Sequence, residues 1–216
     1  MELLYSGAKA VAKATFTIFD WRVHVEHPQR VPAVGPAVLT SNHLSWVDPV
    51  LLGYVADVHR RNIRFLAMSE LWRRRWAASA LNRMRHVPVQ PGESGGITAR
   101  AVSLLREGEL VAVFPEGGIR PAFSPAHGRR GAAEMALASG ASIVPVGVWG
   151  GQHALPPVPG TRPRRHVPLV ACVGVPLAPV GEDPETLTRR VMASIGHQVE
   201  RAQRAWHSLG PDRLRK

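Results

Sequence analysis

The sequence predicts an α/β fold in which a mostly parallel central sheet is flanked by helices and preceded by an N-terminal amphipathic helix. Short apolar runs such as AVLTS (37–41) and ELVAVF (109–114) alternate with helical patterns along the chain, and this alternation is typical of a parallel sheet. The chain has 216 residues, a length that suits a single core. Its 45% hydrophobic and 20% charged residues are ordinary for a globular protein. We therefore expect one main domain.

Residues 1–28 are predicted to form an N-terminal helical region, and residues 29–216 the main domain. The segment LLYSGAKAVAKATFTIFDW places Lys9 and Lys13 among apolar and aromatic side chains. Such a helix can lie in a membrane interface with its aromatic side chains as anchors, or it can pack on the domain itself. The pattern leaves both open. No run approaches the roughly 18 apolar residues of a membrane-spanning helix, and the segment lacks the cleavage site of a signal peptide.

The remaining elements follow from local patterns. Apolar runs predict strands at 37–41, 63–68, 109–114, 142–150 and 167–175, with a shorter strand-like run at 86–90. Helical periodicity predicts helices at 48–58, 69–84, 97–107, 129–139 and from residue 184 onward. Ser69 is expected to cap the second of these helices, Gly108 and Gly140 to end the next two, and Asp183 with Pro184 to begin the last.

The charge of the chain is strongly positive, with a formal net charge of +11 and a pI of about 11.3. It favours a polyanionic partner such as an anionic membrane surface or a phosphorylated substrate, although a solvated basic surface is the alternative. No nucleic-acid-binding motif is present, so nucleic acid is not expected. The ten histidines lack the spacing of metal ligands, so no metal is expected either. The lone Cys172 favours a reducing compartment, and we expect a cytoplasmic protein, peripheral on the inner face of the plasma membrane.

The first candidate loop, NHLSWVD, follows the predicted strand 37–41 and carries His43 and Asp48 five positions apart. A carboxylate can accept a hydrogen bond from one ring nitrogen of a histidine and leave the other free as a base. The pair needs a bend, which Ser45 and Pro49 favour. The spacing from Ser45 to Asp48 is equally typical of a helix cap, so the loop alone leaves catalysis and capping open.

The second candidate loop, FPEGGIRP, follows the strand predicted at 109–114 and places Glu116 before two glycines and Arg120. Glycines allow a ligand to approach the backbone, and arginine binds phosphate or carboxylate groups. Arg129 and Arg130 then precede a predicted helix N-terminus, which is favourable to anions. An ordinary glycine turn with solvated charges is the alternative.

A third candidate is Ser94 in GESGG (92–96), which matches the G-x-S-x-G pattern of serine hydrolases. The preceding run, HVPVQP, is short and carries two prolines, and no glycine-rich oxyanion segment precedes it. A Ser94 esterase is therefore the least favoured of the enzymatic readings.

Taken together and in this order, NHLSWVD, FPEGGIRP and IVPVGV resemble the glycerolipid acyltransferases of the 1-acylglycerol-3-phosphate acyltransferase family. The resemblance implies that residues 29–216 form an acyltransferase domain that moves a fatty acyl group from acyl-CoA or acyl-carrier protein to a lysolipid hydroxyl, without a cofactor. It also implies that His43 is the general base and that Asp48 orients it. The implied substrate-binding residues are Asn42, Ser45, Glu116, Gly117, Gly118, Arg120, Arg130 and Pro145.

The motifs depart from the family pattern at positions that concern the acceptor. In the second family block Arg85 replaces a glycine, and Val89, Gln90 and Pro91 replace Val-Asp-Arg. In the third block the threonine is missing and Arg120 stands one residue later than the family arginine. The acceptor is therefore open between 1-acylglycerol-3-phosphate, a lyso-aminolipid and a lysolipid with a neutral headgroup. A non-catalytic lipid-binding protein is the alternative outside enzymes.

Two arginine clusters stand out, in LWRRRW (73–75) and in TRPRRH (162, 164 and 165). Either could rest on an anionic leaflet, bind the phosphates of CoA or an acidic carrier protein, or be a solvated face.

Overall fold

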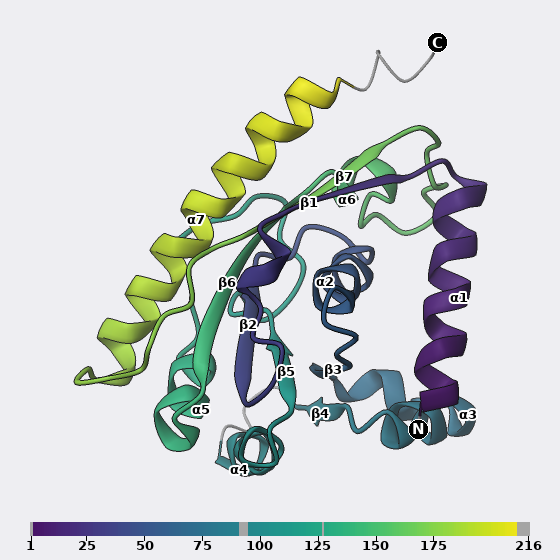
Figure 1. Ribbon diagram of the computed structural model, residues 1–216. Helices are drawn as coiled ribbons and strands as arrows, with labels where there is room; N and C mark the ends of the chain where they lie inside the picture. Colours follow the sequence, from purple (N-terminus) through teal and green to yellow (C-terminus); the bar gives the residue numbers. More distant parts are fainter. Residues whose placement is uncertain (1, 91–94, 127, 211–216) are drawn as a thin grey trace.

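The computed structural model describes residues 2–90, 95–126 and 128–210. Its centre is a seven-stranded sheet in the order β1-β7-β6-β2-β5-β3-β4, with helices on both faces (Figure 1). The strands are β1 Arg22–Glu26, β2 Ala37–Ser41, β3 Ile63–Met68, β4 Val87–Val89, β5 Leu110–Val113, β6 Ser142–Trp149 and β7 Pro168–Val173. The helices are α1 Glu2–Ile18, α2 Asp48–Asp57, α3 Arg75–Arg83, α4 Gly95–Arg106, α5 Gly131–Ser139, α6 Gly151–Ala154 and α7 Pro184–Leu209, with 3₁₀ turns η1 Pro28–Arg30 and η2 Ser69–Arg73.

The sheet is mostly parallel, which confirms the predicted fold class. Strands β2 to β6 run in one direction, and β7 is antiparallel to β6 and carries β1 parallel to itself. Strand β2 is central: its Thr40 lies opposite Val113 of β5 and Pro145 of β6. The loops that follow β2, β5 and β6 therefore leave the sheet at the same edge, where α/β proteins place their sites.

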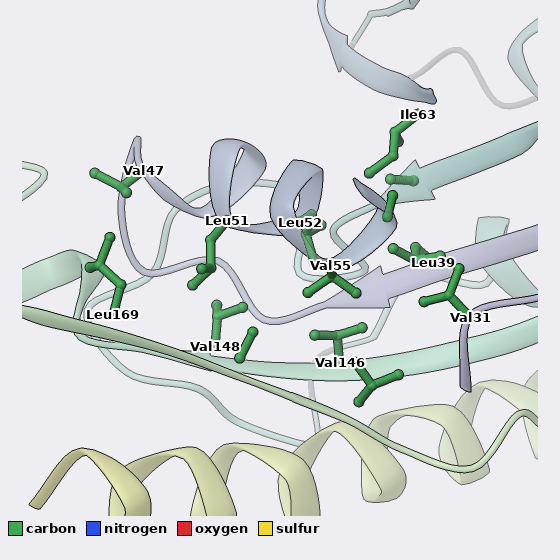
Figure 2. Packing of buried hydrophobic residues seen from close by; sticks show 14 of the residues in the cluster. Val31, Leu39, Val47, Leu51, Leu52, Val55, Ile63, Val146, Val148 and Leu169 are labelled. Carbon is green, nitrogen blue, oxygen red and sulfur yellow. The ribbon is translucent and has the colours of Figure 1, made fainter. Parts of the chain in front are cut away.

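Two hydrophobic layers hold the helices to the sheet. Leu51, Leu52 and Val55 of α2 pack on Leu39 of β2 and Val146 of β6, as Figure 2 shows. The opposite face is covered by α4, α5 and α7, and β2 contributes its alternate residue Val38 there. Each fully buried Leu or Val side chain contributes about 1.5–3 kcal/mol, so the loop after β2 starts from a firmly held strand.

The N-terminal helix packs on the domain through its aromatic face. Tyr5, Phe16 and Trp21 are buried, and the ring of Phe16 stacks on Tyr54 of α2 at 5.1 Å between centroids. The Nζ atom of Lys9 lies 2.8 Å from a carboxylate oxygen of Asp57. These aromatic side chains, which could have served as membrane anchors, thus pack within the domain. Within the described part of the chain, no helix is both long enough and apolar enough to cross a membrane.

Several local predictions need correction. Strand β1 lies inside the predicted N-terminal helical region and pairs with β7, so the sheet begins before residue 29. The helix predicted over 69–84 is divided into η2 and α3 by Arg74, whose backbone is extended, and Ser69 makes no capping bond there. Neither segment buries a side chain, so tertiary packing does not hold one continuous helix.

Other end signals are confirmed. Gly140 ends α5 with a φ of 71°, a left-handed conformation that glycine adopts freely. A carboxylate oxygen of Asp183 accepts the backbone N–H groups of Glu185 and Thr186 at the start of α7. α6 and η1 had no signal in the sequence.

Candidate active site

The loop after β2 brings His43 and Asp48 into direct contact. His43 Nδ1 lies 3.0 Å from Asp48 Oδ2, and the same oxygen accepts the backbone N–H groups of Leu44 at 2.6 Å and Ser45 at 2.7 Å. Asp48 begins α2, and its side chain is 2% exposed. Three donors converge on one buried oxygen, so Asp48 closes the turn and also holds the ring of His43.

The arrangement leaves His43 Nε2 available as a base. Because Asp48 accepts at Nδ1, we assign the ring proton to Nδ1. The imidazole stacks on Phe114, with centroids 3.9 Å apart and planes 13° apart, and its side chain is 12% exposed. The carboxylate and the aromatic ring together fix the orientation of the imidazole, and Nε2 can take a proton from a group that reaches it.

The loop after β5 clamps the backbone of His43. Glu116 Oε1 accepts the His43 N–H at 2.8 Å, and the Arg120 N–H donates to the His43 carbonyl at 2.9 Å. Glu116 is buried; burial raises the pKa of its carboxyl group, and the hydrogen bond from His43 acts in the opposite direction. Glu116 thus holds the backbone of His43, a contact that the sequence did not predict.

Three further predicted substrate-binding residues carry scaffold contacts instead. The amide of Asn42 is buried and pairs with the backbone of Val148 in both directions, at 3.0 and 2.8 Å. The Ser45 hydroxyl is buried and donates to the Leu155 carbonyl at 2.7 Å. Pro145 is buried within β6. None of these three is among the residues that line the cavity beside His43.

A large cavity lies beside His43. Its volume is about 1080 Å³, sufficient for a long ligand. The walls are mainly apolar side chains of α1, α2, β3 and the segment 68–84, and Trp46 and Val158 also contribute. Six cations line it: Lys9, Lys13, Arg61, Arg120, Arg129 and Arg130. The combination suits a ligand with an apolar chain and an anionic group.

The cation closest to the glycine pair is Arg129. A Cβ atom placed on Gly117 would lie 2.4 Å from Arg129 Nε and 2.5 Å from its Cζ, so the guanidinium rests on the bare backbone of Gly117. Among the described residues no carboxylate forms an ion pair with it. Arg130, which was predicted as a substrate contact, instead donates to Glu185 at 3.2 Å and is 61% exposed. Both arginines line the cavity, and Arg129 is the one without a carboxylate partner among the described residues.

Gly151 belongs to the candidate site, although no sequence pattern predicted it. A Cβ atom at this position would lie 2.7 Å from Asp48 Oδ1 and 3.0 Å from Ser45 Cβ. Gly151 begins α6, far along the chain from the His43 loop, so only the fold reveals that it must be small. Ser94 lies outside the described residues, and within them no three metal-ligating side chains form a cluster.

Fold and site together define an α/β protein with a carboxylate-oriented histidine beside a cavity that suits a largely apolar ligand. The pattern of the family described as Acyltransferase matches residues 22–149. The chain is 30% identical over 145 residues to the 1-acyl-sn-glycerol-3-phosphate acyltransferase of Bacillus subtilis, a match that covers 66% of this chain and 71% of the relative. The protein therefore belongs to the acyltransferase family, and the predicted resemblance and enzyme class are confirmed.

The chain also matches an uncharacterized protein and a solved structure. An uncharacterized protein of Mycobacterium leprae is 29% identical over 178 residues, which are 76% of this chain and 45% of that protein. The crystal structure of the 1-acyl-sn-glycerophosphate (LPA) acyltransferase PlsC from Thermotoga maritima superposes with a TM-score of 0.77 at 23% identity, over 92% of this chain and 79% of that one. The structural match shows that the two chains share a fold.

Proposed function

We propose that this acyltransferase moves a fatty acyl group from acyl-CoA or acyl-carrier protein to the hydroxyl of a lysophospholipid, with 1-acylglycerol-3-phosphate as the leading acceptor. The observation that carries the proposal is the His43–Asp48 pair, held at 3.0 Å beside the apolar cavity. The name of the relative from Bacillus subtilis supports the choice of acceptor.

In the proposed reaction His43 Nε2 takes the proton of the acceptor hydroxyl as that oxygen attacks the thioester carbonyl. A carbon–oxygen bond forms, the carbon–sulfur bond breaks, and the departing thiolate takes the proton back from the imidazolium. Asp48 remains ionised and stabilises the imidazolium through Nδ1. The transfer is direct, and it requires no covalent intermediate on the enzyme.

The acceptor phosphate is assigned to Arg129, assisted by Arg120. Arg129 rests on Gly117, next to the residue whose carboxylate holds His43. Arg120 is exposed, lines the cavity and has its own backbone bonded to His43. Because a guanidinium binds phosphate bidentately, these two cations can replace the arginines missing from the family motifs. The fatty acyl chain then occupies the apolar part of the cavity.

The enzyme acts as a peripheral protein on the inner face of the plasma membrane. A net charge of +11 favours attachment to an anionic leaflet, and its lysolipid substrate is delivered from there.

Replacement of His43 by alanine tests the proposal. We expect transfer from a labelled acyl thioester to lysophosphatidate to fall about 10²–10⁴-fold, the usual contribution of a general base, while the variant keeps its fold. His197, exposed on α7, is the control, and its replacement by alanine leaves transfer intact. Undiminished transfer by the His43 variant would remove this residue from the mechanism. A wild-type protein that binds lysolipid without acceptor-stimulated thiol release would be a non-catalytic lipid-binding protein.

Acceptor choice is tested with Arg129→Ala and Arg130→Ala. A charged hydrogen bond contributes about 1.5–3 kcal/mol, so loss of Arg129 should raise the KM for lysophosphatidate about 10- to 100-fold and change the KM for a neutral-headgroup lysolipid little. The Arg130 variant removes the same charge from a side chain that pairs with Glu185. Equal effects of the two substitutions would refute the assignment of the phosphate to Arg129.

A further inference from the structure

The segment formed by η2 and α3 is an uncovered surface of the molecule. Neither element has a buried residue. Trp76 is 72% exposed and Leu71 is 47% exposed, although large apolar side chains normally find cover within a domain. By contrast, the aromatic residues Phe16 and Trp21 at the end of α1 are buried.

The same surface carries an excess of positive charge. Arg73, Arg74, Arg75 and Arg83 are all exposed, and none of them takes part in an ion pair among the described residues. Glu70 is the one acidic residue between residues 69 and 84. An exposed tryptophan among unpaired arginines is the composition of an element that lies in a lipid headgroup layer.

This surface adjoins the cavity that leads to His43. Met68, Leu71, Leu81 and Met84 line the cavity wall. Leu71 is also 47% exposed, so it lies where the cavity wall meets the solvent-facing surface of the segment. The Tyr5 hydroxyl of α1 donates to the Met84 carbonyl at 3.0 Å, and α3 lies beside the N-terminal end of α1 in Figure 1. An apolar chain that leaves a membrane at this surface has a short path to the cavity.

We propose that Leu71, Trp76 and the arginines 73–75 and 83, here called the α3 docking surface, bind the protein to an anionic lipid surface. The tryptophan and the leucine enter the headgroup layer, and the guanidinium groups contact lipid phosphates. The proposal rests on the proposed function only in that the acceptor is drawn from the same membrane. It places the membrane contact on η2 and α3 and not on α1, whose aromatic side chains are occupied by the domain.

Vesicle binding with a matched pair of triple variants tests the surface. Each basic residue near an anionic leaflet contributes about 1 kcal/mol, so the variant R73Q/R74Q/R75Q should bind phosphatidylglycerol-containing vesicles about 100-fold more weakly than wild type. The control R162Q/R164Q/R165Q removes the same charge from the exposed basic cluster at 162–165 and should lose much less affinity for the vesicles. Equal losses of vesicle affinity in the two variants would show general charge attraction and overturn the proposal. Failure of the wild-type protein to bind anionic vesicles would also overturn it.

Fluorescence locates the contact. Vesicles that contain brominated lipid should quench wild-type tryptophan emission, and Trp76→Phe should remove most of that quenching; quenching that persists in this variant would overturn the proposed orientation. Transfer to a short-chain acceptor dissolved below its micellar concentration should be unchanged in R73Q/R74Q/R75Q, whereas transfer to acceptor in vesicles should fall. If the wild type transfers no acyl group at all, the proposed function fails. The vesicle-binding and quenching results would still show whether the α3 docking surface binds lipid.

Discussion

Replacement of Gly117 by alanine, compared with the same change at Gly118, isolates how the glycine pair serves the site. Gly117 has a φ of +76°, and a Cβ atom there would lie 2.4 Å from Arg129 Nε. Gly118 has no atom within 4 Å of such a Cβ and does not have a positive φ in the left-handed range. The two neighbours therefore differ in both backbone conformation and available space, while the chemical change is identical.

The expected stability difference follows from the backbone. An alanine in the left-handed region costs about 1–2 kcal/mol, whereas Gly→Ala at a compatible position is neutral or stabilises by about 0.4–1 kcal/mol through the unfolded chain. For a chain of this size about 1 kcal/mol shifts the unfolding temperature by about 2–4 °C. The two variants should therefore differ by about 1–3 kcal/mol, and G117A should unfold about 2–12 °C below G118A. The contact with Arg129 adds little to this cost, because the end of a flexible side chain can move.

The displaced guanidinium gives a second readout. If Arg129 binds the acceptor phosphate, G117A should raise the KM for lysophosphatidate, and the double variant G117A/R129A should have nearly the KM of R129A alone. Differential scanning calorimetry and initial-rate measurements check both expectations, with G118A as the control. Equal unfolding temperatures for the two alanine variants would refute the backbone argument, and fully additive KM effects would refute the coupling to Arg129.

Two further changes test other parts of the structure. Gly151→Ala should displace the carboxylate of Asp48, which a Cβ atom would approach to 2.7 Å, and should lower kcat with little change in KM; an unchanged kcat in steady-state assays would contradict this positioning role. His86 is buried and accepts the Phe65 N–H, and burial lowers its pKa from 6.5 to about 4. The unfolded state then binds the extra proton between pH 6.5 and 4, so this histidine removes up to about 3 kcal/mol of stability as the pH falls through that range. His86→Gln should flatten this part of the stability profile in chemical denaturation, and an unaltered slope would count against the shift.

Local patterns were sufficient for most of the fold. The strands at 37–41 and 63–68 match β2 and β3 residue for residue, because both are short, mainly apolar runs between loop-forming segments. The failures have a common cause. β1 has partly exposed residues and is held by pairing with β7, and the break at Arg74 reflects the absence of tertiary packing. Neither feature is determined by its own sequence alone.

For the candidate site, the sequence predicted the contact of His43 with Asp48 better than it predicted the contacts of the surrounding residues. The types and spacing of His43 and Asp48 predicted their contact but left catalysis and capping open, and the family resemblance then implied their roles. Their contact depends on residues close in the chain. The roles of Asn42 and Glu116 could not be predicted, because each is fixed by a backbone group from a distant strand or loop, at Val148 and His43 respectively. Arg129 stands nine positions after Arg120, and only the folded loop brings it to Gly117.

Arg120 stands one residue later than the arginine of the family motif, and this shift is consistent with the geometry of the loop. The feature that His43 requires from position 120 is a backbone N–H, which donates to its carbonyl at 2.9 Å, and any residue except proline supplies it. The side chain at this position is therefore free to vary as long as the loop keeps its path, and Glu116 fixes that path through the His43 N–H. Because β2 and β5 are parallel neighbours, their two loops form a single unit around the backbone of His43. The imidazole of His43 can thus keep its geometry whatever side chain stands at position 120. With the acceptor phosphate assigned to Arg129 as proposed, substitutions of Arg129 should change substrate preference without disabling proton transfer.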